Sequence, residues 1–228
     1  AAAAAVRVVP AAVAALRCHL TGTADATAVP VDVVVVDAGR SATDVVRVSG
    51  GHVVTACRVP VGGTVLDGVT AELLGVGGTV DLTRARAVRE ELSLQSRVRG
   101  VEPPVDLGAD AVRCALAPPL AAVVAAVRTV LDGAGPGRSP PVLLIGGVAR
   151  TPLLAELLDA AGVPDVRVAE RPDAAAVVGA LRLPAQLLGP PLAVSPTAGP
   201  VTGSSTTCWL PPVATARRRP LRALATGA

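Results

Sequence analysis

Residues 31–44 read VDVVVVDAGRSATD, and this stretch decides the fold class of the 228-residue chain. Its unbroken β-branched run is typical of a strand buried on both faces, and the Asp-Ala-Gly that begins at Asp37 indicates a tight turn at the end of that strand. Residues 43–48 and 52–59 are two further strand candidates, separated by a Gly-Gly pair. The three strands should therefore form a meander joined by hairpins.

Helical and strand patterns continue after residue 60. Helices are predicted at residues 64–74, 82–94, 109–131, 151–161 and 173–181, and strands at 98–105, 141–145 and 166–168. We expect Thr64 to cap the first of these helices and Pro118-Pro119 to kink the third. The order is three strands and a helix, a helical insertion, and then alternating helices and strands. It predicts a mixed-sheet α/β layer architecture.

The composition favours a folded core and argues against several classes of function. Apolar residues make up 51% of the chain and charged residues 17%, which excludes a fibrous or largely disordered protein. The net charge is only +3, and a basic stripe with stacking aromatic residues is missing, so nucleic-acid binding is not expected. The four cysteines stand apart without metal-ligand spacing, which favours a reducing compartment and a cytoplasmic location.

The two ends of the chain carry no clear targeting signal. The Ala- and Val-rich start is interrupted by Arg7 and Pro10, so a signal peptide is not predicted. Residues 184–228 are rich in proline and end in an arginine cluster at 217–222, and such a composition cannot form a membrane-spanning helix. We expect this tail to be disordered and basic, and to offer a docking element for protein partners.

Three glycine-containing turns follow predicted strands, at Asp37-Ala38-Gly39, Gly62-Gly63-Thr64 and Gly146-Gly147. Such turns place backbone N–H groups and helix dipoles at one edge of a sheet, where a phosphate or a ribose can bind. Over residues 6–183 the order and spacing of the turns resemble the superfamily shared by actin, sugar kinases and the heat-shock chaperone ATPases. The resemblance implies one actin-like ATPase (ribonuclease H-like) lobe with a mixed sheet and a short helical insertion.

Several short motifs carry this resemblance. Residues 31–44 resemble the second phosphate motif of the superfamily, and VGGTVLD at 61–67 resembles the start of a chaperone helix. VREELS at 88–93 is similar to the adenine-side helix, and PAA at 10–12 is similar to a connecting helix. VLLIGGVARTP at 142–152 resembles the adenosine motif, and RPD at 171–173 with VGA at 178–180 resembles the downstream partner of that motif. We therefore expect a connecting helix region at 1–30, a nucleotide-binding lobe at 31–183 with an inserted subdomain at about 76–108, and the tail at 184–228.

The resemblance also implies roles for single residues in binding ATP or ADP with magnesium. Asp37 would hold Mg²⁺ through water, a role that suits a carboxylate at a strand end. Arg150 would stack its guanidinium on the base. The residues implied to contact the nucleotide are Gly39, Gly62 and Gly63 on the phosphate and ribose side, and Arg89, Ser93, Gly146, Gly147, Arg150 and Asp173 on the adenosine side. Simpler roles stay open: a turn for Asp37, a surface position for Arg150 and a helix cap for Asp173.

The chain departs from the family pattern in ways that bear on activity. No first phosphate motif precedes residue 30, lysine is absent, Val9 stands where an acidic residue is usual, and Ser41-Ala42 replace a Gly-Thr pair. Because phosphoryl transfer depends on positioning and charge neutralisation, hydrolysis is expected only if a missing N-terminal lobe completes the site. The alternative is a non-catalytic scaffold. The short insertion and Pro-rich tail look like actinobacterial chaperone-like proteins associated with type VII secretion.

Overall fold

A five-stranded mixed sheet forms the centre of the computed structural model, which describes residues 9–20, 32–75, 81–94, 107–135 and 139–182. Its elements are α1 (Ala11–Leu20), β1 (Val33–Ala38), β2 (Thr43–Ser49), β3 (His52–Val59), α2 (Gly63–Leu73), α3 (Leu82–Leu92), α4 (Ala109–Asp132), β4 (Val142–Ile145), the 3-10 helix η1 (Gly147–Arg150), α5 (Pro152–Ala160), β5 (Val166–Val168) and α6 (Ala175–Leu181). The predicted mixed-sheet α/β architecture is confirmed.

The strand order in the sheet is β3-β2-β1-β4-β5. β1, β2 and β3 pair antiparallel as the predicted meander, whereas β4 and β5 continue from β1 in parallel. Gly50 and Gly51 form the two-residue turn between β2 and β3, with φ values of +57° and +81°. Two successive residues with positive φ are what a tight hairpin of this kind requires, and glycine adopts them without steric cost.

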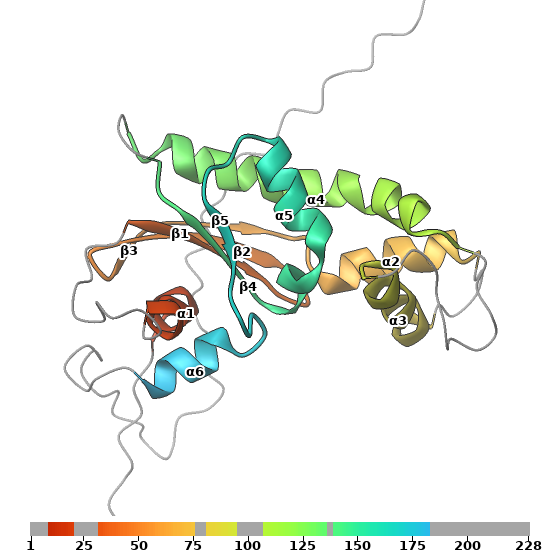
Figure 1. Cartoon of the computed structure of the whole chain (residues 1–228), viewed down its shortest axis with the longest axis horizontal. Helices are drawn as coiled ribbons and strands as arrows, with labels where there is room; N and C mark the ends of the chain where they lie inside the picture. The colour runs from red at the N-terminus through yellow and green to blue at the C-terminus, as the bar shows by residue number, and fades with distance from the viewer. Residues whose placement is uncertain (1–8, 21–31, 76–80, 95–106, 136–138, 183–228) are drawn as a thin grey trace, which may run out of the picture.

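Helices cover both faces of the sheet, which explains the unbroken valine run of β1. Figure 1 shows α4 and α5 on one face and α1 and α6 on the other. Successive side chains of a strand point to opposite faces. Val34 and Val36 accordingly pack in the larger core cluster with α4 and α5, and Val33 and Val35 in the smaller cluster with α1. All four valines are buried.

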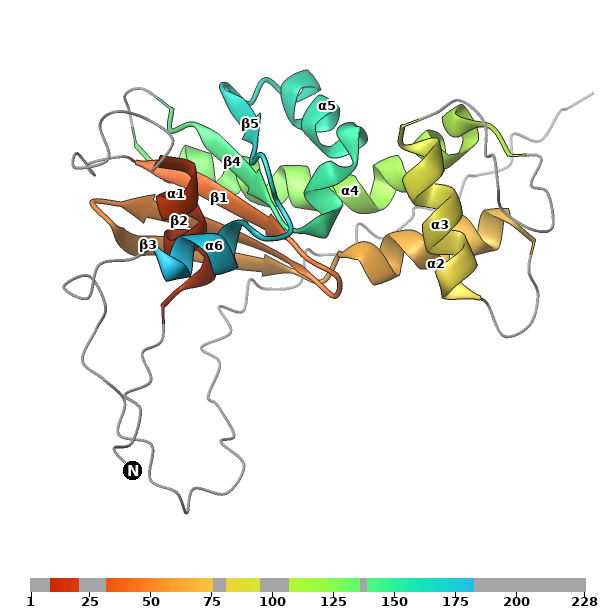
Figure 2. The ribbon, with the colours of Figure 1, turned by 60° about the horizontal axis from the view of Figure 1, so that its bottom comes forward.

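α2 and α3 lie side by side beyond the end of β1, as Figure 2 shows. α3 is the described part of the predicted insertion at 76–108, and the strand pair predicted at 98–105 lies outside the described residues. The prediction that Thr64 caps α2 is wrong: the helix begins at Gly63, and Gly62 is its N-cap. Thr64 is thus the second residue of the helix, and its N–H donates to the carbonyl of Arg40.

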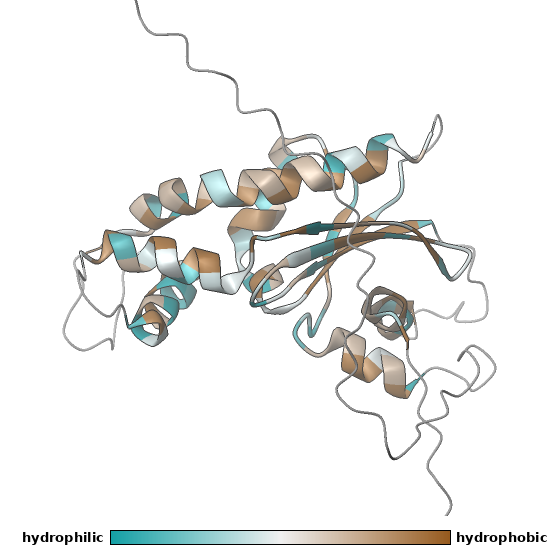
Figure 3. Ribbon diagram, turned by 180° about the vertical axis from the view of Figure 1, so that it is seen from behind, coloured by the Kyte–Doolittle hydropathy of each residue, from teal (hydrophilic) through white to brown (hydrophobic). Residues whose placement is uncertain are grey.

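α4 is by length and composition able to cross a membrane, although no such span was predicted. It runs unbroken through Pro118 and Pro119. One side of it, which includes Leu116, Leu120 and Val127, belongs to the larger core cluster against the sheet, and Figure 3 shows apolar residues along the helix. Its packing against the sheet accounts for the apolar residues on that side, while the most apolar 18-residue window of the helix is 28% buried.

α1 and α6 cross closely at Gly179. A Cβ atom at this position would overlap the carbonyl of Ala14 in α1, so only glycine permits the observed approach. Both helices had been predicted, α1 as the connecting helix and α6 through its Val-Gly-Ala sequence. Their contact gives the Gly179 of that sequence a physical reason.

Candidate functional site

A groove of about 610 Å³ opens between α3 on one side and the segment from η1 to α5 on the other. The strand end and loop at 168–173 close its third side. Five residues that the sequence predicted as nucleotide contacts line it: Arg89, Ser93, Gly147, Arg150 and Asp173. Arg89 and Ser93 precede the other three by more than fifty residues, so the fold brings the two groups together. Their contact with a nucleotide stays a prediction.

Arg150 and Asp173 form an ion pair at the groove. Arg150 Nη2 lies 2.6 Å from Asp173 Oδ1, and both side chains are half exposed. The hydrogen bond from Arg150 lowers the pKa of the Asp173 carboxyl, and its own backbone N–H lowers it further. Asp173 is not the cap of α6, which has Ala174 in that place. The carboxylate therefore holds the guanidinium that was predicted to stack on the base.

Arg89 lines the groove with its side chain turned into the protein. Its residue exposure is only 4%, and its Nε lies 2.8 Å from Asp67 Oδ1 in α2. Its Nη1 lies 3.4 Å from Thr151 Oγ1 at the start of α5. The Ser93 hydroxyl donates to the Arg89 carbonyl, so this hydroxyl offers its lone pairs to a ligand rather than its proton.

The charges along the groove largely cancel. Arg86 pairs with Glu90 at 2.7 Å on the exposed side of α3, Arg89 pairs with Asp67, and Arg150 pairs with Asp173. Each cationic side chain that lines the groove thus has an acidic partner. A groove of this kind suits a flat, uncharged group with polar edges better than a polyanion.

The other predicted residues lie outside the groove, where β1 and β4 end and α2 begins. A Cβ at Gly62 would lie 2.6 Å from the Ala42 nitrogen. Gly146 has a φ of +86°, and a Cβ there would overlap the Ala38 carbonyl and lie 2.8 Å from Asp37 Oδ1. Its N–H donates to the Pro172 carbonyl at 2.7 Å, which ties this turn to the loop that carries Asp173. These glycines permit close backbone approach.

The first amides of α2 are occupied by the chain itself. The Gly63 N–H donates to the Gly39 carbonyl at 3.0 Å, and the Thr64 N–H donates to the Arg40 carbonyl at 2.8 Å. A helix N-terminus attracts anions through amides that have no partner within the helix. Here the turn between β1 and β2 supplies those partners. The backbone of Gly62 and Gly63 shapes the turn, and its contact with a phosphate stays a prediction.

Asp37 is the predicted magnesium-binding residue and lies half-buried at the end of β1. Burial raises the pKa of its carboxyl, and the charge of Asp44 raises it further. The two residues are directly opposite in the β1–β2 ladder. Among the described residues no group of three or more metal-ligating side chains occurs. A single carboxylate fits a hydrated Mg²⁺, which keeps most of its water and would offset the repulsion between the two aspartates.

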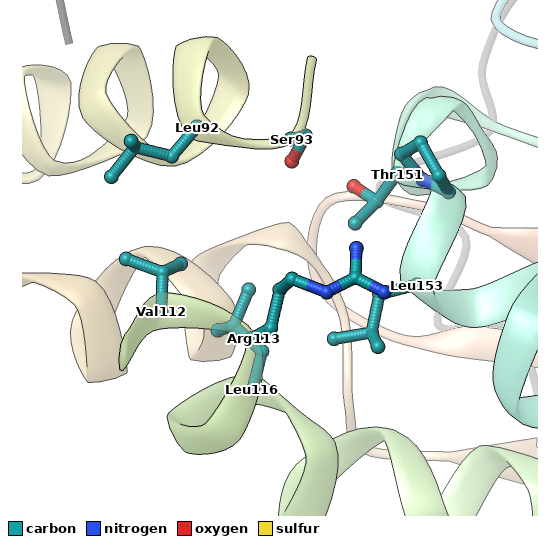
Figure 4. A pocket seen from close by; sticks show the side chains of 8 residues that line it. Leu92, Ser93, Val112, Arg113, Leu116, Thr151 and Leu153 are labelled. Atoms are coloured by element: carbon teal, nitrogen blue, oxygen red, sulfur yellow. The ribbon is translucent and has the colours of Figure 1, made fainter. Parts of the chain in front are cut away.

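A second pocket beside the groove is too small for a ligand. Leu92, Val112, Leu116 and Leu153 line it, and its volume is about 10 Å³ (Figure 4). This is room for about one water molecule. Arg113 at its edge forms an ion pair with Glu156, which joins α4 to α5. The pocket therefore belongs to the packing between helices.

Comparisons with known proteins agree with the fold. No protein-family model matches the chain, and no curated protein matches it by sequence. The crystal structure of ethanolamine utilization protein EutJ from Carboxydothermus hydrogenoformans matches with a TM-score of 0.53 and 20% identity. The match covers 75% of this chain and 53% of that protein, so the chain spans about half the length of EutJ. At this identity the likeness establishes the fold, and the actin-like ATPase fold predicted from the sequence is confirmed.

Proposed function

We propose that this chain is the ATP- or ADP-binding lobe of a heat-shock-chaperone-like protein, with the adenosine in the groove between α3 and η1. One observation carries the proposal: two walls predicted separately from the sequence, with Ser93 on one and Gly147 and Arg150 on the other, border the same groove. Its volume of about 610 Å³ falls within the usual range for small-molecule sites.

The lining of the groove fits a purine nucleoside. A Cβ at Gly147 would meet no atom within 4 Å, so this backbone borders open space that a flat ring can occupy. The Arg150 guanidinium, held by Asp173, offers a planar cation on which a base can stack. Ser93 and the exposed carboxylate of Glu90 offer hydrogen-bond acceptors to the exocyclic amino group of adenine.

The phosphates would extend from Gly147 past Gly146 toward Asp37, which would hold a hydrated Mg²⁺. Magnesium would supply charge neutralisation for the phosphates there. We propose binding without hydrolysis for this chain, because phosphoryl transfer needs groups that position and neutralise the phosphates from both sides. ATP turnover by a longer protein would require groups from a second lobe.

Calorimetric titration tests the proposal. Adenosine, ADP and ATP, each with and without Mg²⁺, should bind the wild-type chain, and Arg150→Ala should weaken all three. Arg167→Ala is the matched control, because Arg167 is equally exposed and equally ion-paired, with Asp165, but does not line the groove. Absence of adenosine binding to the folded wild-type chain contradicts the proposal.

A non-catalytic scaffold associated with type VII secretion is the second candidate. One observation favours it: the amides of Gly63 and Thr64 are already bonded to the β1–β2 turn. In this case the Pro-rich tail at 184–228, which lies outside the described residues, would bind protein partners. A cytoplasmic location is proposed for both candidates. An Asp-x-Gly-Thr motif encoded upstream of Ala1 would favour the nucleotide-binding protein, and its absence the scaffold.

A further inference from the structure

A third cavity, of about 250 Å³, lies where β1 and β4 begin, on the face of the sheet that α1 covers in Figure 1. The nucleotide groove lies at the opposite end of these strands, beyond the last residue of β4. Six apolar residues line the cavity, from α1, β1 and the start of β4: Leu16, Leu20, Val33, Pro141, Val142 and Leu143. Four of them are buried, namely Leu16, Val33, Val142 and Leu143, so the cavity reaches the hydrophobic core.

The polar residues that line this cavity are His19 and Arg167. His19 stands in the last turn of α1. Arg167 is opposite Leu143 in the parallel β4–β5 ladder, so its side chain points to the same face of the sheet as Leu143. A guanidinium only donates hydrogen bonds, and an imidazole offers at least one N–H in either protonation state. None of the described residues that line the cavity carries a carboxylate.

Asp165 fixes the orientation of Arg167. Arg167 Nε lies 2.7 Å from Asp165 Oδ1, and Arg167 Nη2 lies 3.0 Å from Oδ2. Asp165 has a φ of +50°, a value that non-glycine residues rarely adopt, and its carbonyl accepts the N–H of Val142 in the cavity wall at 3.1 Å. The Nη1 group of Arg167 forms no hydrogen bond within the described ranges of the chain. Arg167 can therefore bind a ligand through Nη1 without breaking its ion pair.

We propose that this cavity binds a straight-chain aliphatic carboxylate, with the hydrocarbon chain against the buried apolar wall and the head group at Arg167 and His19. The lining selects this ligand because both polar residues donate hydrogen bonds, and an ionised carboxylate only accepts them. The volume lies just below the range of about 300–1,000 Å³ for drug-sized ligands, which favours a short or medium chain. The cavity shares no lining residue with the nucleotide groove, so the proposal is independent of the proposed function.

Calorimetric titration of the full chain with hexanoate, octanoate and octan-1-ol tests the assignment. Affinity should rise about 4-fold for each methylene group that is added and buried, and octanol should bind more weakly than octanoate. Arg167→Ala should weaken octanoate binding up to about 5-fold, as expected for a half-exposed ion pair, and should leave octanol binding unchanged. Arg58→Ala is the matched control, because Arg58 is similarly exposed and paired with Asp44 but does not line the cavity.

Nuclear magnetic resonance of the histidine rings locates the bound ligand. The chain has two histidines, and His52 at the start of β3 does not line the cavity. Octanoate should shift the ring signals of His19, identified with His19→Gln, and leave those of His52 unchanged. A bound octanoate that shifts neither ring, or both equally, overturns the site. Equal losses in Arg167→Ala and Arg58→Ala, or equal affinities for octanoate and octanol, overturn recognition of the carboxylate. Absence of octanoate binding to the folded chain overturns the proposal, whether or not adenosine binds.

Discussion

Arg89 Nε lies 2.8 Å from Asp67 Oδ1 inside the protein, where the two side chains are 5% and 12% exposed. The pair joins α3 to α2, and the same guanidinium reaches Thr151 at the start of α5. One side chain thus connects three elements around the groove. Because both charges are removed from water, loss of Arg89 leaves the Asp67 carboxylate buried without its cation, and loss of Asp67 leaves Arg89 only the longer contact of 3.8 Å to the exposed Glu90.

Asp67→Ala should therefore destabilise the fold strongly. Removing one partner of a buried ion pair typically costs about 3–5 kcal/mol of unfolding free energy. Urea unfolding at neutral pH measures the change. Glu156→Ala is the control, since Glu156 pairs with Arg113 at the surface, where such a loss costs at most about 1 kcal/mol. Equal losses of unfolding free energy in the two variants would show that the buried ion pair stabilises the fold no more than the surface pair does.

The elements of the fold could largely be predicted because their signals are local. The valine run of β1 indicated a strand buried on both faces, and the double glycine at Gly50 indicated the hairpin that follows β2. The predicted cap at Thr64 was wrong because the Arg40 carbonyl, more than twenty residues earlier, already accepts its N–H. A contact between residues this far apart in the chain cannot be predicted from the local sequence around either of them.

The sequence named five residues that line one groove, but it did not indicate the contacts that these residues make. Arg89 and Asp173 were expected to face a nucleotide, and the structure pairs them with Asp67 and Arg150. These partners are 22 and 23 residues apart in the chain, and only the packing of the elements brings them together. Asp67 stood in the VGGTVLD motif, so a search for acidic partners of Arg89 could have found it.

Asp173→Asn should weaken adenosine binding without loss of stability. The change removes the charge that holds Arg150 over the groove, and the guanidinium then samples more orientations. Because the pair is exposed, we expect a decrease of less than about 5-fold in affinity and an unchanged unfolding midpoint.

A double-mutant cycle distinguishes positioning from direct contact by Asp173. If Asp173 acts through Arg150, then Asp173→Asn should have no further effect on adenosine affinity in the Arg150→Ala variant. Additive losses would mean that Asp173 contacts the ligand itself, as the resemblance to the chaperone ATPases implies. Titration of adenosine into the four proteins gives the answer.

Asp37→Asn should stabilise the chain at neutral pH. Burial and the charge of Asp44 raise the pKa of Asp37 above its ordinary value of 3.8. The folded chain thus binds this proton more tightly than the unfolded chain. The resulting stabilisation is complete below the unfolded pKa and is lost as pH rises through the folded pKa. The stability gap between variant and wild type should therefore be widest at neutral pH and narrow as the pH falls toward 4, as urea unfolding would show.

Magnesium should reduce this difference in stability between Asp37→Asn and the wild type if Asp37 holds the hydrated ion. Millimolar Mg²⁺ with ADP should raise the unfolding midpoint of the wild-type chain more than that of Asp37→Asn, since ligands that bind only the folded state stabilise it. Asp159→Asn removes an exposed carboxylate from α5 and should respond like the wild type. An equal magnesium response in the wild type and in Asp37→Asn would remove the metal role from Asp37.

Gly179→Ala should destabilise the chain, whereas Gly68→Ala should stabilise it. A Cβ at Gly179 would overlap the carbonyl of Ala14, so α6 must move away from α1, and overpacking of this kind typically costs about 1–3 kcal/mol. Gly68 lies within α2 with no atom within 4 Å of its would-be Cβ, and alanine in an open helical position gains about 0.5–1 kcal/mol. Urea unfolding of both variants compares the same chemical change at a closed and an open site. Stabilisation by both would mean that α1 and α6 do not cross as closely as the structure has them.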